Sequence, residues 1–192
     1  MVLGFVLAAI VSVWLTVLAG TGIGLHFAQL GRWLHILSGV MWIGLLYYFN
    51  VVQVPGMADA AADKGGPGGA GVSKYIAPRA LLWFRWAAVA TWVTGAWYLM
   101  ASYGGASGIH KAFALQEGFR TIGIGAWLGT IMLFNVWVLI WPNQKKILGM
   151  VEASDAEKAQ ARKTALLASR TNFVLSIPML LCMGGQVHGL PF

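Results

Sequence analysis

The sequence predicts an all-α integral membrane protein: a bundle of five transmembrane helices, with a cytoplasmic amphipathic helix between the fourth and the fifth. Its 192 residues are 58% hydrophobic and only 10% charged, whereas soluble domains carry about 25% charged residues. Such a chain cannot cover a water-exposed surface with polar groups. Its apolar residues also run in stretches of about 20, the length that a helix needs to cross a bilayer. The whole chain, residues 1–192, is therefore expected to form one transmembrane domain.

Five apolar stretches define the expected spans, because hydrocarbon requires every backbone polar group to be paired within its own helix. They cover residues 3–25, 32–53, 80–102, 119–141 and 166–185. The first starts without Lys or Arg and is too long for the apolar part of a signal peptide, so we expect a retained helix. Residues 54–79 are rich in Gly and Pro and are expected to form a cytoplasmic loop. Residues 143–165 are charged and Ala-rich, with Ser154 and Glu157 at capping-box spacing, which predicts a cytoplasmic helix leading into the last span.

The net charge of +7 indicates membrane topology rather than nucleic-acid binding, because the basic residues lie in short segments between the apolar stretches. With five spans, ten of the thirteen Lys and Arg residues fall on the side of the N-terminus. Positive charge favours the cytoplasm. The N-terminus is therefore predicted to be cytoplasmic and the C-terminus periplasmic, with the lipid bilayer as the surrounding partner.

The four histidines fall at or near the outer face in this topology, and they are the candidate metal or haem ligands. A histidine nitrogen with a free lone pair binds haem iron, copper or zinc. His35 opens the second span and His188 follows the fifth, as two axial ligands of a b-type haem would be placed. His26 and His110 are further candidates. The alternative for each is a solvated, hydrogen-bonded ring, but ionisable groups inside spans are usually functional, which favours His35.

The inner half collects a second set of polar residues. The candidate cofactor- or anion-binding residues there are Arg85, Asn135, Asn143, Gln144 and Asn172. No Asp or Glu occurs within a predicted span to pair with Arg85. Arg85 either snorkels to the interface or meets an anion such as a haem propionate, a lipid phosphate or an acidic substrate. The asparagines have a structural alternative, since amides link transmembrane helices by about 1 kcal/mol each.

Two further features concern packing. The single cysteine, Cys182, excludes a disulfide within the chain and is most simply a small core residue. Gly125 and Gly129 form a GxxxG pattern in the fourth span. That pattern serves close helix packing within the bundle or at a homo-oligomer contact, and the sequence leaves both open.

Four stretches, RWLHILSGVMWIG, WFRWAAVATWVTG, WPNQKKI and TNFVLSIPMLLCM, occur in this order along the chain. Together they resemble the membrane domain of the bacterial membrane-bound urate hydroxylases, the family defined by a urate-oxidase N-terminal domain. The similarity covers most of the chain from about residue 30 onward. Its most specific piece is the turn Pro142, Asn143 and Gln144 followed by lysines, and the match is poor around LLYYFNVVQVP.

The resemblance implies oxidation of urate or a related purine in a bacterial inner membrane, with electrons passed to a cytochrome c. It also implies that His35 and His188 lie where the family places histidines. Characterised members carry a C-terminal cytochrome c domain, whereas this sequence contains no CxxCH motif. The resemblance therefore implies a separate cytochrome c or a respiratory complex as the electron acceptor.

Three functional hypotheses follow. The first is a redox membrane protein of the urate hydroxylase type that binds haem b, copper or another metal, with His35 and His188 as the preferred ligands. The second is a non-catalytic accessory subunit without a cofactor, which packs against a larger respiratory or oxidase complex through its Trp- and Gly-rich faces. The third is a small transporter, which ranks last because transport usually requires carboxylates or paired broken helices within the membrane.

Overall fold

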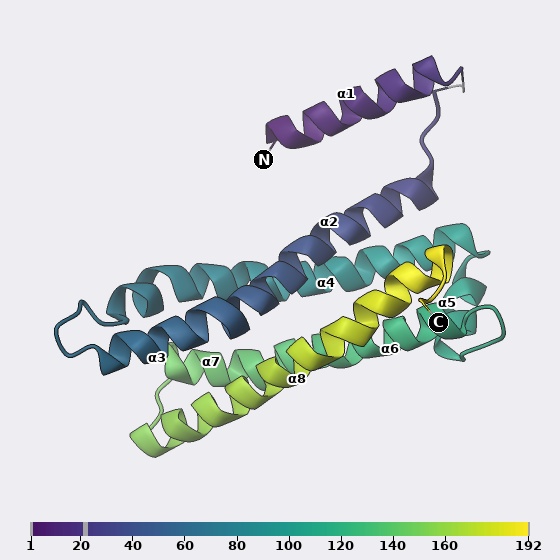
Figure 1. The fold of residues 1–192 in the computed structure, drawn as a ribbon. Coiled ribbons are helices and arrows are strands. Elements are labelled where there is room, and N and C mark those ends of the chain that lie inside the picture. The colour runs from purple at the N-terminus through teal and green to yellow at the C-terminus, as the bar shows by residue number, and fades with distance from the viewer. Residues whose placement is uncertain (1, 21–22, 192) are drawn as a thin grey trace.

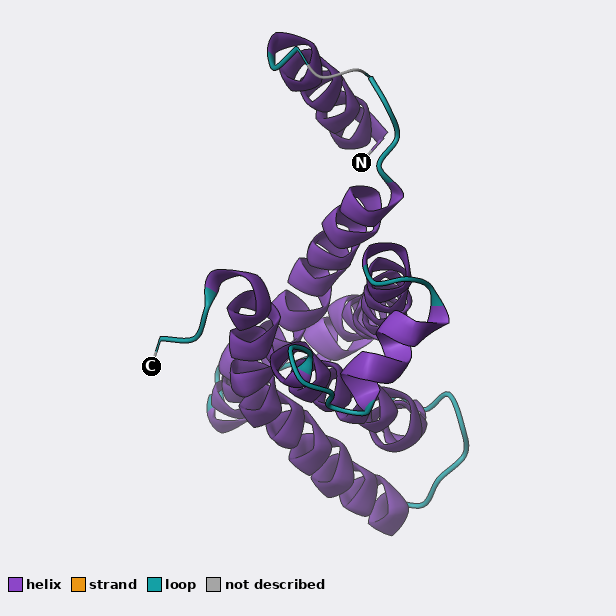
Figure 2. Ribbon diagram, turned by 90° about the vertical axis from the view of Figure 1, so that its right-hand side faces the viewer, coloured by secondary structure: helices purple, strands orange, loops and turns teal. Residues whose placement is uncertain are grey.

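The computed structural model describes residues 2–20 and 23–191, and every regular element in those ranges is helical. The long helical rods of the bundle alternate in direction along the chain, and α1 stands apart from them (Figures 1 and 2). The elements are α1 (Val2–Leu18), α2 (Phe27–Tyr47), η1 (Tyr48–Gln53), α3 (Val54–Ala62), η2 (Val72–Ile76), α4 (Ala77–Ser102), α5 (Ala106–Phe113), α6 (Arg120–Phe134), η3 (Asn135–Ile140), α7 (Trp141–Ile147) and α8 (Asp155–His188), where η marks π-helical stretches. The first rod joins α2, η1 and α3, the second η2 and α4, and the third α6, η3 and α7.

Three helices are long and apolar enough to cross a membrane: Phe27–Ala62, Arg120–Ile147 and Asp155–His188. They contain the second and fifth predicted spans and nearly all of the fourth, which supports the all-helical membrane class by length and composition. The third predicted span is a helix of 26 residues, α4, whose arginines and tryptophans lower its mean hydropathy. The helix in the first predicted span, α1, has 17 residues and ends at Leu18, and residues 21–22 of that span lie outside the described ranges. Crossing by α1 and α4 remains a prediction.

The loop predicted over 54–79 is wrong for most of its length. Only residues 63–69 lie outside helices, since α3 continues the α2 rod and a helix resumes at residue 70. Pro55, Pro78 and Pro142 each stand at the start of an α-segment that directly follows a π-helical stretch. A π-turn is wider than an α-turn, so it accommodates the ring and the missing N–H group of proline where an α-helix would break.

Residues 143–165 do not form the separate helix predicted for them. Their first part ends α7, and residues 148–154 link α7 to α8. The predicted capping box is present, because Ser154 accepts a hydrogen bond from the backbone of Glu157 and the Glu157 side chain accepts one from Ser154. This box starts a single helix of 34 residues that continues through Pro178. The Ala-rich sequence after Ser154 favours helix throughout, so nothing separates an extramembrane helix from the last span.

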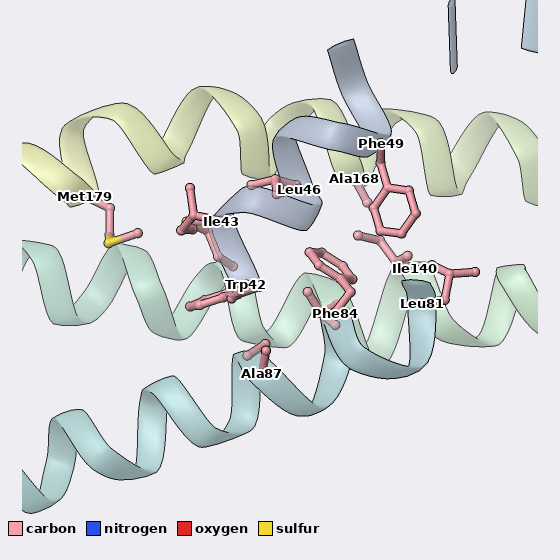
Figure 3. Close-up of a cluster of buried hydrophobic side chains, with 13 residues drawn as sticks. Trp42, Ile43, Leu46, Phe49, Leu81, Phe84, Ala87, Ile140, Ala168 and Met179 are labelled. Atoms are coloured by element: carbon pink, nitrogen blue, oxygen red, sulfur yellow. The ribbon is translucent and has the colours of Figure 1, made fainter. Parts of the chain in front are cut away.

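The core lies where the α2, α4, α6–η3 and α8 rods meet (Figure 3). Trp42, Leu46, Phe84 and Met132 are almost inaccessible, with at most 2% of their surface exposed. The rings of Phe49 and Phe84 pack edge to face, with centroids 5.4 Å apart. Since lipid tails are as apolar as these side chains, the bundle depends on close packing and interhelical hydrogen bonds more than on exclusion of water.

Candidate functional site

His35 lies on α2 and is half-buried against α4. Its Nδ1 is 2.7 Å from the carbonyl oxygen of Thr91. A carbonyl oxygen can only accept, so Nδ1–H donates this bond and the neutral ring keeps its lone pair on Nε2. The Thr91 bond thus selects one tautomer and fixes the plane of the ring, as the backbone carbonyl behind a metal-bound histidine does.

The backbone of α4 admits the imidazole because Gly95 has no side chain. A Cβ atom at this position would lie 2.9 Å from both Cε1 and Nδ1 of His35, closer than real Cβ atoms approach other groups. Two glycines of α2 belong to the same α2–α4 seam. A Cβ at Gly31 would meet the Trp97 ring at 3.4 Å, and one at Gly39 would meet the Thr91 methyl group at 3.7 Å. The sequence offers no sign that Gly95 faces a histidine.

The other three candidate ligands are exposed at helix ends. His26 is the N-cap residue of α2, His110 lies in the last turn of α5, and His188 ends α8. The start of α2, α5 and the C-terminus all lie at one end of the bundle (Figure 1). Residues 2–20 and 23–191 contain no group of three or more His, Cys, Asp or Glu side chains that could hold a metal ion. A site formed by the described residues would therefore use fewer than three such side chains, as a haem can.

Two of the inner candidates, Asn135 and Asn172, bond to each other. Asn135 Nδ2 donates to Asn172 Oδ1 at 2.8 Å, and Asn172 Nδ2 donates to the Met132 carbonyl oxygen at 3.0 Å. Both asparagines are buried. They link η3 and α6 to α8, which is the structural role that amides serve between transmembrane helices. Asn143 donates to the Leu139 carbonyl oxygen of its own rod at 2.7 Å.

Gln144 lines a cavity of about 470 Å³ at the end of the bundle opposite to α5. Gln53, Arg162 and Ser169 are among the other lining residues, and the rest of the wall is mostly apolar. Within the described ranges, Oε1 of Gln53 is buried and has no hydrogen-bond donor. The burial of this oxygen depends on how α8 packs on η1, which the sequence does not show.

Arg85 lies on α4 with its guanidinium carbon 3.5 Å from the centroid of the Trp141 ring. The side chain is half-buried. Among the residues that the structure describes, no acceptor contacts its buried Nη1. The arginine therefore stacks on an aromatic face but makes no ion pair there.

This arrangement defines a helical membrane protein with one oriented histidine inside the bundle. Residues 105–190 match the family model described as urate oxidase N-terminal. The second half of the chain, from α5 to the end of α8, is thus similar to the urate-oxidase N-terminal family, which confirms the resemblance over that range. The range contains His110 and His188 but not His35. No curated protein and no solved structure matches the chain.

Proposed function

We propose that this protein is a redox membrane protein related to the urate hydroxylases, which binds haem or a metal ion through His35 and passes electrons to a separate cytochrome c or respiratory partner. The observation that carries the proposal is the 2.7 Å hydrogen bond from His35 Nδ1–H to the Thr91 carbonyl oxygen. This bond places the lone pair of the neutral ring on Nε2, where it can coordinate a metal ion. Metal-bound histidines almost always anchor their second nitrogen in this way.

The surroundings of His35 fit a ligand better than a packing residue. The missing Cβ at Gly95 makes room for the imidazole within a seam of closely packed helices. A side chain that only filled space there would be apolar, because an unpaired ring nitrogen in a membrane protein costs free energy. A bound iron or copper ion would supply one-electron redox chemistry, and Thr91 and Gly95 would hold the imidazole in place for it.

His188 is the second residue that we propose would hold a haem. It ends α8, at the same end of the bundle as the start of α2, and it lies within the range that matches the family model. A haem with two histidine ligands would be low-spin, whereas one with His35 alone would be high-spin. Copper or another metal is the alternative cofactor, and urate or a related purine is the proposed substrate class.

The proposed location is a bacterial inner membrane, with the N-terminus in the cytoplasm and the C-terminus in the periplasm. The cationic residues support it, because the α3–η2 link, α7 and the start of α8 lie at the end opposite to α5 (Figure 1). Positive charge is retained on the cytoplasmic side. Labelling of Lys145 and His188 from opposite faces of the membrane would test this orientation.

A second candidate function, an accessory subunit of a respiratory or oxidase complex, is favoured by α1. No residue of this helix is buried, and its contact with the bundle includes the Phe5 ring against Trp33 at 5.7 Å. A helix that packs so little on its own chain is available to a partner subunit or to a second copy of the chain.

Absorption spectroscopy and metal analysis of the purified protein separate the two candidates. The redox proposal predicts bound haem or metal that is lost in His35→Ala and retained in His110→Ala, a matched control at an exposed histidine of the same end. His188→Ala is expected to keep the haem but convert it from low-spin to high-spin. A colourless, metal-free wild-type protein would contradict the proposal, and co-purification with oxidase subunits would then support the accessory role.

A further inference from the structure

Two cations flank the same tryptophan ring at the end of the bundle opposite to α5. The Arg85 guanidinium carbon lies 3.5 Å from the centroid of Trp141, and Lys145 Nζ lies 5.8 Å from it. Arg85 comes from α4 and Lys145 from α7, so two separate rods bring these charges together. Like charges held close to one ring repel each other, and a nearby anion would offset that repulsion.

The part of the chain that the structure describes does not provide that anion. Lys146 pairs with Glu157 at 3.9 Å, but within residues 2–20 and 23–191 neither Arg85 nor Lys145 makes an ion pair. Nη1 of Arg85 is buried with no acceptor there. The α4–α7 seam therefore presents two positive groups without a protein carboxylate, at the level of a tryptophan typical of the membrane interface.

An apolar groove of about 520 Å³ lies between α4 and the α6–η3 part of the rod that contains α7. Its wall is formed by Trp86, Val89, Trp92, Thr130, Leu133, Phe134 and Trp137. The Thr130 hydroxyl donates to Ala126 and accepts from the Trp92 indole, so it offers nothing to a polar ligand. The segment from Trp86 to Trp92 extends about 9 Å along the helix axis, away from the cations.

The groove and the cation pair form one continuous surface. Arg85 directly precedes Trp86, and Trp141 follows Trp137 by one helical turn. Trp86 and Trp137 both line the groove, and their rings pack edge to face with centroids 5.4 Å apart. A molecule lying here would place an apolar chain against the tryptophans and a negative group against Arg85 and Lys145.

We propose that this surface is a specific binding site for one anionic phospholipid, such as phosphatidylglycerol, from the leaflet at the cationic end of the bundle. The phosphate contacts Arg85 and Lys145, and one acyl chain lies in the groove lined by Trp86, Val89 and Phe134. A planar guanidinium binds a phosphate group through paired hydrogen bonds. These bonds would hold one lipid headgroup in a fixed position, unlike the headgroups of the surrounding bilayer. A soluble anion would use the cations but leave the groove without an occupant. The site does not depend on the haem or metal proposed for His35.

The test counts bound lipid by native mass spectrometry. The full chain is purified in detergent, delipidated and titrated with dioleoyl phosphatidylglycerol or with dioleoyl phosphatidylcholine. One phosphatidylglycerol is expected to bind at least fivefold more tightly than phosphatidylcholine. Arg85→Gln and Lys145→Gln are each expected to weaken phosphatidylglycerol binding about fivefold, which corresponds to the contribution of one cation near an anionic membrane surface. Val89→Trp keeps every charge but fills the groove, and should weaken both lipids.

The matched control is Lys163→Gln, an exposed cation near the start of α8, which should leave the preference for phosphatidylglycerol unchanged. Equal binding of the two lipids, no effect of Arg85→Gln and Lys145→Gln, or an equal loss in the control would overturn the proposal. Displacement of the lipid by millimolar inorganic phosphate, with Val89→Trp neutral, would assign the cations to a soluble anion and also overturn it. Because Lys145 lies at the end of a helix, its variant remains informative if Arg85→Gln does not fold.

Discussion

Two seams of the bundle, α2–α4 and η3–α8, differ in how their polar side chains are hydrogen-bonded. In the α2–α4 seam, Nδ1–H of His35 donates to the Thr91 carbonyl oxygen, and Nε2 has no hydrogen-bond partner among the residues that the structure describes. In the seam between η3 and α8, the Asn135 amide donates to the Asn172 side chain, and the Asn172 amide donates to the backbone of Met132. Both seams contain residues that a sequence would nominate for function. A candidate ligand differs from a structural link because one of its polar atoms has no hydrogen-bond partner in the folded protein.

Gly95→Leu is expected to have the largest effect on cofactor binding. It removes the space for the His35 imidazole without changing the histidine itself. Even the Cβ would lie 2.9 Å from the His35 ring, so the ring must rotate away from Thr91. We expect complete loss of the bound haem or metal, read from the Soret band and from metal content. Gly44→Leu is the matched control on the opposite helix, since nothing lies within 4 Å of a Cβ there. Retention of full cofactor in Gly95→Leu would show that the His35 position is not required.

The asparagine pair should instead affect stability alone. Asn172→Ala removes a hydrogen bond to Met132 and leaves Asn135 without its partner, which should cost about 1–3 kcal/mol. Thermal unfolding in detergent, followed by circular dichroism, measures the loss. Cofactor content per folded protein should not change. A selective loss of cofactor in a fully folded Asn172→Ala protein would move the functional site toward α8.

A smaller effect is expected at the start of α8. Ser154 and Glu157 form a reciprocal capping box, and the side-chain oxygen of Glu157 lies 2.8 Å from the Ser154 amide. Ser154→Ala should destabilise the first turns of the helix by about 1 kcal/mol. Hydrogen exchange over residues 155–160 should accelerate, while Ser107→Ala, outside any cap, should leave that region unchanged.

The smallest effect is expected for Asn143. Its amide donates to Leu139 in the same rod, so it holds no two helices together. Asn143→Ala should change the unfolding free energy by less than about 0.5 kcal/mol, the usual size for a site outside an interhelical network. A loss as large as that of Asn172→Ala would mean that hydrogen-bond partners do not separate the two kinds of amide.

Much of the fold follows from the sequence. Apolar run length predicts the membrane helices, and Ser154 with Glu157 predicts the start of α8. The rod through Pro55 does not follow, because proline normally ends a helix and only the preceding π-helical stretch allows it to continue. The short helix α5 was not predicted either, since eight residues carry little periodic signal.

For the site, the residue types are visible in the sequence but their partners are not. His35 stands out as an ionisable group inside an apolar run. Its bond to Thr91, 56 residues away in the sequence, and its contact with Gly95 depend on the register of α2 against α4. The pairing of Asn135 with Asn172 and the burial of Gln53 depend likewise on helix packing. The sequence pattern alone therefore could not distinguish the imidazole of His35 from the asparagine amides that bond to each other.

Ligand rescue tests the central claim most directly. His35→Gly should purify without the Soret band or bound metal, and millimolar imidazole added during reconstitution should restore it, because the small molecule can occupy the space that the ring leaves beside Gly95. That result would show that an imidazole at this position is the ligand. A Soret band or metal content in His35→Gly equal to that of the wild type, with no response to imidazole, would contradict the account.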